Sequence, residues 1–301
     1  TVCSRIPLVI IQEEFPDLQS LLDSTDSTGY FKNITGVTLP VYRDMVESGA
    51  LKYDWQNDCI IRIYNGFSTI RPEFPLMYSA NFFNYLGLYS NMGGEASPGT
   101  PKKLANEMLD KLPSEFWSDP EKTFLDPSMT NGMFYFLLVE RLFDGLSEKI
   151  PDSRKRIVHI LTKQVWGHEM NKAPFEFVKK MLNKQFGIGS SINIEPNLCY
   201  NNILDEELNM KFDVVVMNPP YQAPQEADGK RGGGDLLWHK FVKNSISSFT
   251  KSNGYICAVH PSGWRKPPSE RSKYNGMFEL MTGDHHMEYL ELHDSKDGMK
   301  T

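Results

Sequence analysis

The sequence has few cysteines and no long apolar run. Its four cysteines, Cys3, Cys59, Cys199 and Cys257, show no CxxC spacing, which excludes a disulfide framework and a locally built zinc site. No run of eighteen apolar residues is present, and the first residues lack the charged-then-apolar pattern of a secretion signal. We therefore expect neither a membrane span nor secretion, but a reducing compartment such as the cytoplasm.

The sequence also lacks an initiator methionine, and it stops at Lys300-Thr301 without a closing element. We therefore expect a piece of a longer protein. The 301 residues are 40% apolar and 23% charged, which suits one large α/β domain with a smaller one beside it.

Positive charge is scarce overall but locally concentrated. The formal net charge is −6, and residues 1–100 hold 6 basic against 11 acidic side chains. Residues 222–275 reverse this balance, with 9 basic and 4 acidic side chains. A local positive field is enough to attract a polyanion, because exposed charges are screened beyond about 8 Å. A solvated surface explains this charge equally well.

The N-terminal third has no clear periodicity. We expect strands at 4–12 and 59–64 and a short helix at 41–51. Residues 91–101 are rich in Gly, Pro and Ser and are typical of a linker. We therefore predict two domains, with an N-terminal region of unknown role at 1–98 and a second domain at 99–301.

The second domain alternates between apolar strand patterns and helical patterns. Expected strands are 122–126, 163–169, 192–201, 212–218, 254–261 and 286–294, and expected helices are 100–112, 132–146, 173–186 and 235–249. Near-continuous apolar strands between helices indicate a parallel sheet that is covered on both faces. The predicted fold class is α/β, a doubly wound and mostly parallel sheet, in which ligands bind at the carboxyl ends of the strands.

Polar residues follow three of these strands. Asp126 precedes a turn and a helix, Glu169 ends the next strand, and Asn202 lies in an Asx-rich turn. An acid before a helix N-terminus repels phosphate and suits a cationic or hydroxyl-bearing ligand, and an acid at the second strand commonly accepts from ribose hydroxyls. Each residue also has a plain explanation as a turn or surface residue.

The fourth strand end is Asn218-Pro219-Pro220-Tyr221, directly after the apolar run FDVVVM. The pattern is compatible with a rigid turn. Two prolines fix φ near −65° twice and remove two donors, which leaves carbonyl acceptors beside an aromatic ring. Such acceptors suit the amino group of a flat molecule.

Four features in this order resemble S-adenosylmethionine-dependent amino-methyltransferases. They are TPxxLA at 100–105, DPSMTNGMF at 126–134, Glu169 and NPPY at 218–221. They are most similar to the gamma-class N6-adenine DNA methyltransferases of bacterial and phage restriction-modification systems. The resemblance covers residues 100–293 and implies a Rossmann-like methyltransferase fold for the second domain. NPPY alone does not specify DNA, because glutamine methyltransferases of release factors share it.

The resemblance implies a pocket for S-adenosylmethionine. Its residues are Thr100, Pro101, Asp126, Pro127, Thr130, Asn131, Gly132, Phe134, Glu169, Asn202 and Asn218. Thr100 is expected to cap the helix that closes on the methionine moiety, with Pro101 at its first position. Glu169 is expected to hold the ribose hydroxyls, and Asn202 stands where the family has an aspartate that contacts the adenine amine.

The resemblance also implies DNA as the partner, in a bacterial, phage or viral host cell. The target adenine is flipped out and stacks on Tyr221, while the catalytic residues are Asn218, Pro219, Pro220 and Tyr221. Lys230, Arg231 and Asp235 are expected at the target strand and pocket edge. Target recognition is expected from further domains or subunits. The alternatives are a protein-glutamine or RNA methyltransferase, or a degenerate DNA-binding or assembly subunit.

One departure from the family pattern, in the loop at 126–134, bears on this hypothesis. The usual loop is DPxCGSGxF, whereas this sequence has Met129, Thr130 and Asn131 before Gly132. Glycine permits close backbone approach, so Thr130 is expected to narrow the pocket or rearrange the turn. No metal is expected, because 286–294 alternates like a strand and places neighbouring side chains on opposite faces.

Overall fold

The structure is a computed structural model of the 301-residue chain. It describes residues 15, 17–27, 29, 31–32, 37–50, 100–186, 192–222, 236–265, 274, 276–283 and 285–292. The expected strands at 4–12 and 59–64 lie outside the described residues. In the N-terminal region the described helices are α2 (Leu18–Asp23) and α4 (Leu39–Glu47), and α4 covers most of the helix expected at 41–51.

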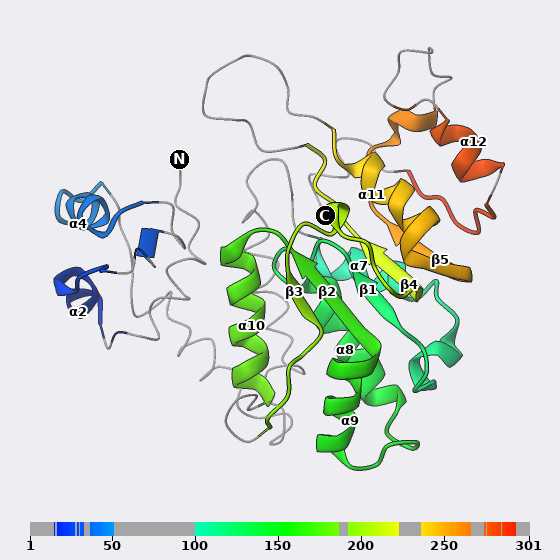
Figure 1. The fold of residues 1–301 in the computed structure, drawn as a ribbon, viewed down its shortest axis with the longest axis horizontal. Helices are drawn as coiled ribbons and strands as arrows, with labels where there is room; N and C mark the ends of the chain where they lie inside the picture. Colours follow the sequence, from blue (N-terminus) through cyan, green and yellow to red (C-terminus); the bar gives the residue numbers. More distant parts are fainter. Residues whose placement is uncertain are drawn as a thin grey trace.

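Five parallel strands form one sheet within residues 124–258 (Figure 1). They are β1 (Phe124–Asp126), β2 (Val165–Glu169), β3 (Leu198–Tyr200), β4 (Phe212–Met217) and β5 (Thr250–Ala258), in the spatial order β3-β2-β1-β4-β5. All four pairings are parallel. The predicted doubly wound parallel sheet is therefore confirmed. The strand order reverses between β1 and β4, where such sheets open a crevice for ligands.

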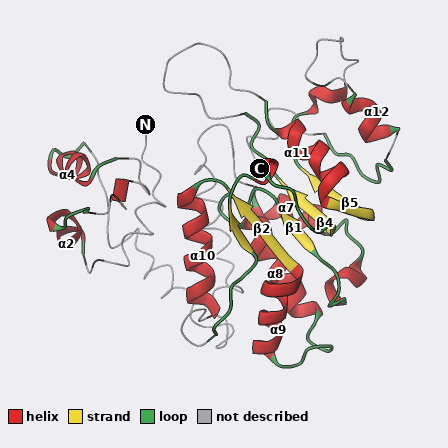
Figure 2. Ribbon diagram, in the orientation of Figure 1, coloured by secondary structure: helices red, strands yellow, loops and turns green. Residues whose placement is uncertain are grey.

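Helices cover both faces of this sheet (Figure 2). The α-helices are α7 (Lys102–Leu109), α8 (Met133–Gly145), α9 (Ser153–His159), α10 (Lys172–Phe186), α11 (Trp238–Asn244) and α12 (Met277–Thr282). Short 3-10 helices occupy Ser114–Ser118, Ile203–Asp205 and Ser262–Arg265. The π-helical turns Ile160–Gln164 and Ser245–Phe249 lead directly into β2 and β5.

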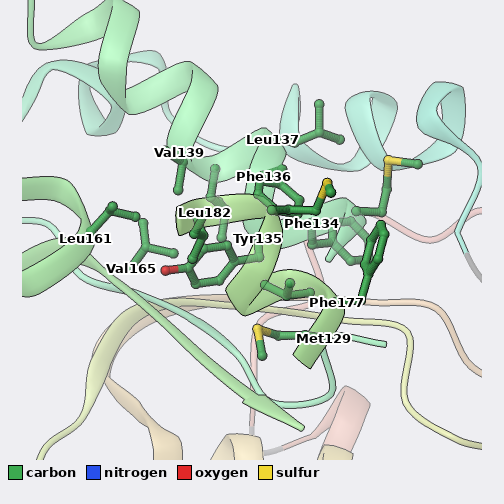
Figure 3. Packing of buried hydrophobic residues seen from close by; sticks show 14 of the residues in the cluster. Met129, Phe134, Tyr135, Phe136, Leu137, Val139, Leu161, Val165, Phe177 and Leu182 are labelled. Atoms are coloured by element: carbon green, nitrogen blue, oxygen red, sulfur yellow. The ribbon is translucent and has the colours of Figure 1, made fainter. Parts of the chain in front are cut away.

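Alternate strand residues point into two separate cores. Phe124, Val214 and Val216 pack with the helices α7 to α10, and Figure 3 shows the α8 part of this core. Leu125 and Val215 face the other side, where they pack with α11 and α12. Helix α8 buries nine side chains, which explains its apolar sequence, and each fully buried one stabilises the fold by roughly 1.5–3 kcal/mol.

Several element predictions were wrong in part. The expected strand at 286–294 is not a strand in its described part, 286–292, where Tyr289 and Leu292 are half exposed. The expected strand at 192–201 shrinks to β3, and the helix expected at 235–249 is split between α11 and a π-helical turn. Helices α2, α9 and α12 are described where the sequence predicted none.

Asp213 links neighbouring strands at the end of the sheet opposite the predicted site. Its carboxylate accepts hydrogen bonds from Thr123 N at 3.0 Å and Thr123 Oγ1 at 2.8 Å, and it pairs with Lys251 Nζ at 2.7 Å and Lys122 Nζ at 3.3 Å. Partial burial favours a higher pKa, but the bonds from Lys251 and Thr123 outweigh it and lower the pKa of Asp213 to about 2. The ionised form therefore ties the beginnings of β1, β4 and β5 together.

We expect Asp213→Asn to lower the free energy of unfolding at neutral pH by roughly 1–3 kcal/mol, the contribution of hydrogen bonds to a charged group. A carboxylate with a lowered folded pKa stabilises the protein above its unfolded pKa of about 3.9, and this stability is lost as the pH falls through about 2. Denaturant unfolding should therefore give a difference between variant and parent that shrinks across this acid range. Glu148→Gln, at an exposed acid, is the control.

Candidate active site

The loop after β1 places Asp126 in the interior. The side chain is 1% exposed, and its Oδ1 accepts from Ser128 N at 3.2 Å. Its Oδ2 is buried and has no hydrogen-bond partner among the described residues. Burial raises the pKa of Asp126 to about 8, the Ser128 amide works against this, and the nearby Glu169 charge adds to it. The loop therefore holds a buried carboxyl group with an acceptor position to spare.

Glu169 ends β2, the strand beside β1, and it is held by three donors. Its Oε1 accepts from Asn171 N at 2.7 Å and Asn171 Nδ2 at 2.9 Å, and its Oε2 accepts from Thr130 N at 2.8 Å. Burial raises the pKa of Glu169, while these bonds oppose the rise. Oε1 therefore accepts two of these bonds and Oε2 accepts one.

Thr130 reaches Glu169 by adopting a left-handed backbone. Its φ is 51°, a conformation that glycine adopts freely and a β-branched residue rarely does. Met129 N donates to His168 O at 3.0 Å, and a Cβ on Gly167 would meet Met129 Sδ at 2.0 Å. The loop thus packs on β2 where β2 has no side chain. Thr130 stands where the family pattern has glycine. Its backbone keeps the left-handed conformation of the turn and is strained there.

Replacing Thr130 by glycine should stabilise the protein. The change relieves a left-handed β-branched residue, worth about 1 kcal/mol, and removes only a long bond of 3.3 Å from Thr130 Oγ1 to Ser128 O. Denaturant titration should show a higher free energy of unfolding for Thr130→Gly. Thr130→Ala keeps the Cβ and loses the same bond, so it should show no gain. A glycine variant less stable than the alanine variant contradicts strain at this position.

The other predicted loop residues serve packing and capping in the structure. Asn131 Oδ1 accepts from Met133 N at 3.2 Å at the start of α8, and Pro127 and Phe134 are buried. Gly132 has a φ of 85°, and a Cβ there would meet Phe136 at 2.8 Å and Val178 at 2.9 Å. Gly132 is therefore needed for the close packing of α8 against α10. A role of these residues in ligand binding stays a prediction.

Asn218, Pro219, Pro220 and Tyr221 follow β4 at the same edge of the sheet. Pro219 is buried, the other three are half-buried, and Tyr221 packs against the core beneath α11. Tyr221 O accepts from Leu237 N at 3.0 Å, and Gln222 and Leu236 form an antiparallel bridge. Burial raises the pKa of Tyr221, so its ring stays neutral. The motif is thus fixed by the chain that returns to it at 236–237.

An aromatic cluster supports this corner from the α11 side. Trp238 and His260 stack with ring centroids 4.9 Å apart and an interplanar angle of 4°, and Trp238 also contacts Tyr274 at 5.3 Å. His260 follows β5, whose Ala258 pairs with Met217 of β4. Burial lowers the pKa of His260, which favours the neutral ring. Trp238 and Trp264 are buried at 0% and 2% exposure, so both are packing residues.

Two predicted pocket residues have other contacts. Thr100 is buried but is not the cap of α7, because that helix begins at Lys102 with Pro101 as its N-cap; this prediction was wrong. Asn202 Oδ1 accepts from Leu204 N at 3.3 Å, and its Nδ2 donates to Asp205 Oδ2 at 2.8 Å. Asn202 thus caps a 3-10 turn just after β3, with one lone pair of its oxygen left.

The structure brings Asp126, Thr130 and Glu169 into one group and sets the Asn218 motif on the strand next to β1. Lys230, Arg231 and Asp235 lie outside the described residues. Sequence reasoning missed Asn171 and Ser128. The signal for both was an Asx or Ser residue two positions after a strand-ending acid, which is a common side-chain to backbone turn.

Other features of the described residues lie apart from this group. A hollow of about 520 Å³ is lined by Arg154, Lys155, Lys163 and segment 192–194, next to the beginning of β2 rather than its end.

No group of three or more His, Cys, Asp or Glu side chains in the described ranges could hold a metal ion. No helix described for this chain combines the length and apolar character that crossing a bilayer requires.

Residues 150–296 match the family model described as Eco57I restriction-modification methylase. This match confirms the predicted resemblance. The matched segment contains β2 to β5, Glu169 and the Asn218 motif, whereas β1 and its loop precede it.

Two relatives are described in similar terms. An "uncharacterized adenine-specific methylase" of Mycoplasma pneumoniae is 25% identical over 257 residues, which cover 63% of this chain and 60% of that protein. The chain thus spans about three fifths of the length of this relative. The methyltransferase subunit of a type I restriction-modification system from Streptococcus thermophilus overlaps with a TM-score of 0.46 at 16% identity, covering 88% of this chain and 56% of that chain.

Proposed function

We propose that the chain is the catalytic part of an enzyme that methylates the N6 amine of a flipped-out adenine in DNA, with S-adenosylmethionine as the methyl donor. The observation that carries the proposal is the juxtaposition of three strand ends. The buried acid group Asp126 and Glu169 ends β1 and β2, and Asn218 to Tyr221 ends β4, which pairs with β1. The family match and the adenine-specific relative support this reading.

The acid group suits a cofactor with cationic and hydroxyl groups. Asp126 Oδ2 is buried without a described partner, and Glu169 Oε2 accepts a single described bond, from Thr130 N. Two adjacent buried carboxyl groups disfavour a phosphate-bearing ligand by like-charge repulsion, and they favour an ammonium group and ribose hydroxyls. Asp126 and Glu169 would therefore hold S-adenosylmethionine. When bound, this cofactor supplies an electrophilic methyl group.

The residues after β4 would position the target amine. A base within a duplex cannot reach a buried site, so the adenine must be flipped out, which costs a few kcal/mol. Tyr221 would stack on the flipped base, a contact worth about 1–3 kcal/mol. The Asn218 side-chain oxygen and the Pro219 carbonyl would accept the two N6 hydrogens. These bonds favour a pyramidal nitrogen and free its lone pair from the ring, so catalysis is positioning and electrostatics.

The test is methyl incorporation from labelled S-adenosylmethionine into DNA, RNA and release-factor protein offered separately. We expect label in DNA alone. Label in protein or RNA but not in DNA contradicts the proposed substrate. DNA binding should weaken as salt rises, because phosphate contacts release counterions.

A further inference from the structure

Glu169 and Asp126, the two acids of the candidate cofactor pocket, differ in the hydrogen bonds that the protein donates to them. Glu169 receives three N–H donors at 2.7–2.9 Å, from Asn171 and Thr130. Asp126 receives one such bond, from Ser128 N at 3.2 Å, and a weaker contribution from the amide of Tyr135. Charge-assisted bonds from N–H groups favour a carboxylate over a carboxylic acid, so the negative charge of the pair is best placed on Glu169.

Asp126 is left in surroundings that oppose a second charge. It is 1% exposed, and its Oδ2 has no described partner. The groups that act on it are Glu169 from β2, the amide of Ser128 in its own loop and, more weakly, the amide of Tyr135 in α8. No lysine or arginine of the described residues forms an ion pair with either acid. Burial and the Glu169 charge raise the pKa of Asp126 to about 8.

We propose that Asp126 is the charge-sensing residue of the pocket, carrying a proton while the pocket is empty and giving it up when a cationic cofactor group reaches Oδ2. This inference rests on the proposed function. The Asp126 O–H bond breaks, its electron pair stays on the carboxylate, and the proton passes to solvent. Asp126 thereby selects for a cationic ligand, because a neutral group cannot compensate a second negative charge beside Glu169.

The direction of the pH dependence follows from the protonation of Asp126 in the empty and in the occupied pocket. In the empty pocket Asp126 is mostly protonated at neutral pH, because its pKa is about 8. A cation at Oδ2 lowers that pKa, so binding near pH 7 should release about one proton. Cofactor affinity should rise by up to about tenfold per pH unit below the empty-pocket pKa, and it should fall again where the ligand's own ammonium group, with an ordinary pKa of about 7.8, loses its proton.

Calorimetry in buffers of different ionisation enthalpy tests the proposal with S-adenosylmethionine as the probe. The parent protein should release about one more proton than Asp126→Asn at neutral pH. Asp126→Asn also measures the protons that the ligand's own amino group exchanges on binding, because the ordinary pKa of that group, about 7.8, lies in the same range. Equal proton release from parent and variant overturns the proposal. A folded parent protein that binds no cofactor contradicts the proposed function instead.

A second measurement needs no binding by the variant. Carbon NMR of carboxyl-labelled aspartate in the empty protein should show one signal that titrates near pH 8 and is missing from Asp126→Asn. Adding S-adenosylmethionine to the parent should move this signal to the ionised position at neutral pH. A signal that titrates near the ordinary aspartate pKa of about 3.9 overturns the proposal.

Discussion

Asn218→Ala should lower the rate of methyl transfer by at least about 100-fold, the effect of removing one preorganised polar group from a catalytic site. The side chain follows a strand that is buried on both faces, and Pro219 and Pro220 fix the backbone after it. The alanine removes an acceptor for the target amine and leaves Asp126 and Glu169 in place. Cofactor binding should therefore stay within a few-fold of the parent.

Single-turnover methylation and calorimetry together measure the two halves of this prediction. Asn193→Ala is the matched control, because Asn193 is exposed and lies before β3, away from the strand end that carries Asn218. Tyr221→Ala should give a similar loss through weaker stacking of the flipped base. Parent-like turnover in Asn218→Ala contradicts the role assigned to the motif.

Glu169→Ala should weaken cofactor binding by about 100-fold or more. Hydrogen bonds to a charged group contribute about 1.5–3 kcal/mol each, and 1.4 kcal/mol is a factor of ten. The change also leaves Thr130 N and both Asn171 donors without their acceptor, so the loop after β1 loses its tie to β2. The dissociation constant for S-adenosylmethionine is the quantity to measure.

Glu169→Gln separates the two causes of weaker cofactor binding, which are the lost charge and the lost tie between the loop and β2. Glutamine keeps one acceptor oxygen and the shape of the side chain, so thermal unfolding should match the parent more closely than that of Glu169→Ala. Affinity should still fall, because the charge is gone. Glu121→Ala, at an exposed acid before β1, should change neither quantity. Undiminished affinity in Glu169→Ala contradicts a place for Glu169 in the cofactor pocket.

The parts of the site that follow from local pattern could be predicted from the sequence. The apolar run of β4 and the two prolines after it predict where the strand ends. Parallel alternation then places the ends of β1, β2 and β4 at one edge. Asp126, Glu169 and Asn218 were therefore expected near one another before any contact was known.

What could not be predicted depends on contacts between distant segments. The bond from Thr130 N to Glu169 joins residues 39 apart in sequence, and it fixes the loop after β1 to the end of β2. The left-handed backbone of Thr130 opposes its residue type. Residues 286–292 alternate like a strand, yet local alternation does not provide a neighbour to pair with, and none of the described strands pairs with this segment.

Nucleoside analysis is the decisive test of adenine N6 methylation. The protein is incubated with labelled S-adenosylmethionine and DNA of mixed sequence, and the DNA is then digested to nucleosides and separated. The label should elute as N6-methyl-2′-deoxyadenosine and should disappear with Asn218→Ala. Label in a methylated cytosine, or unlabelled DNA from a protein that binds the cofactor, would contradict it.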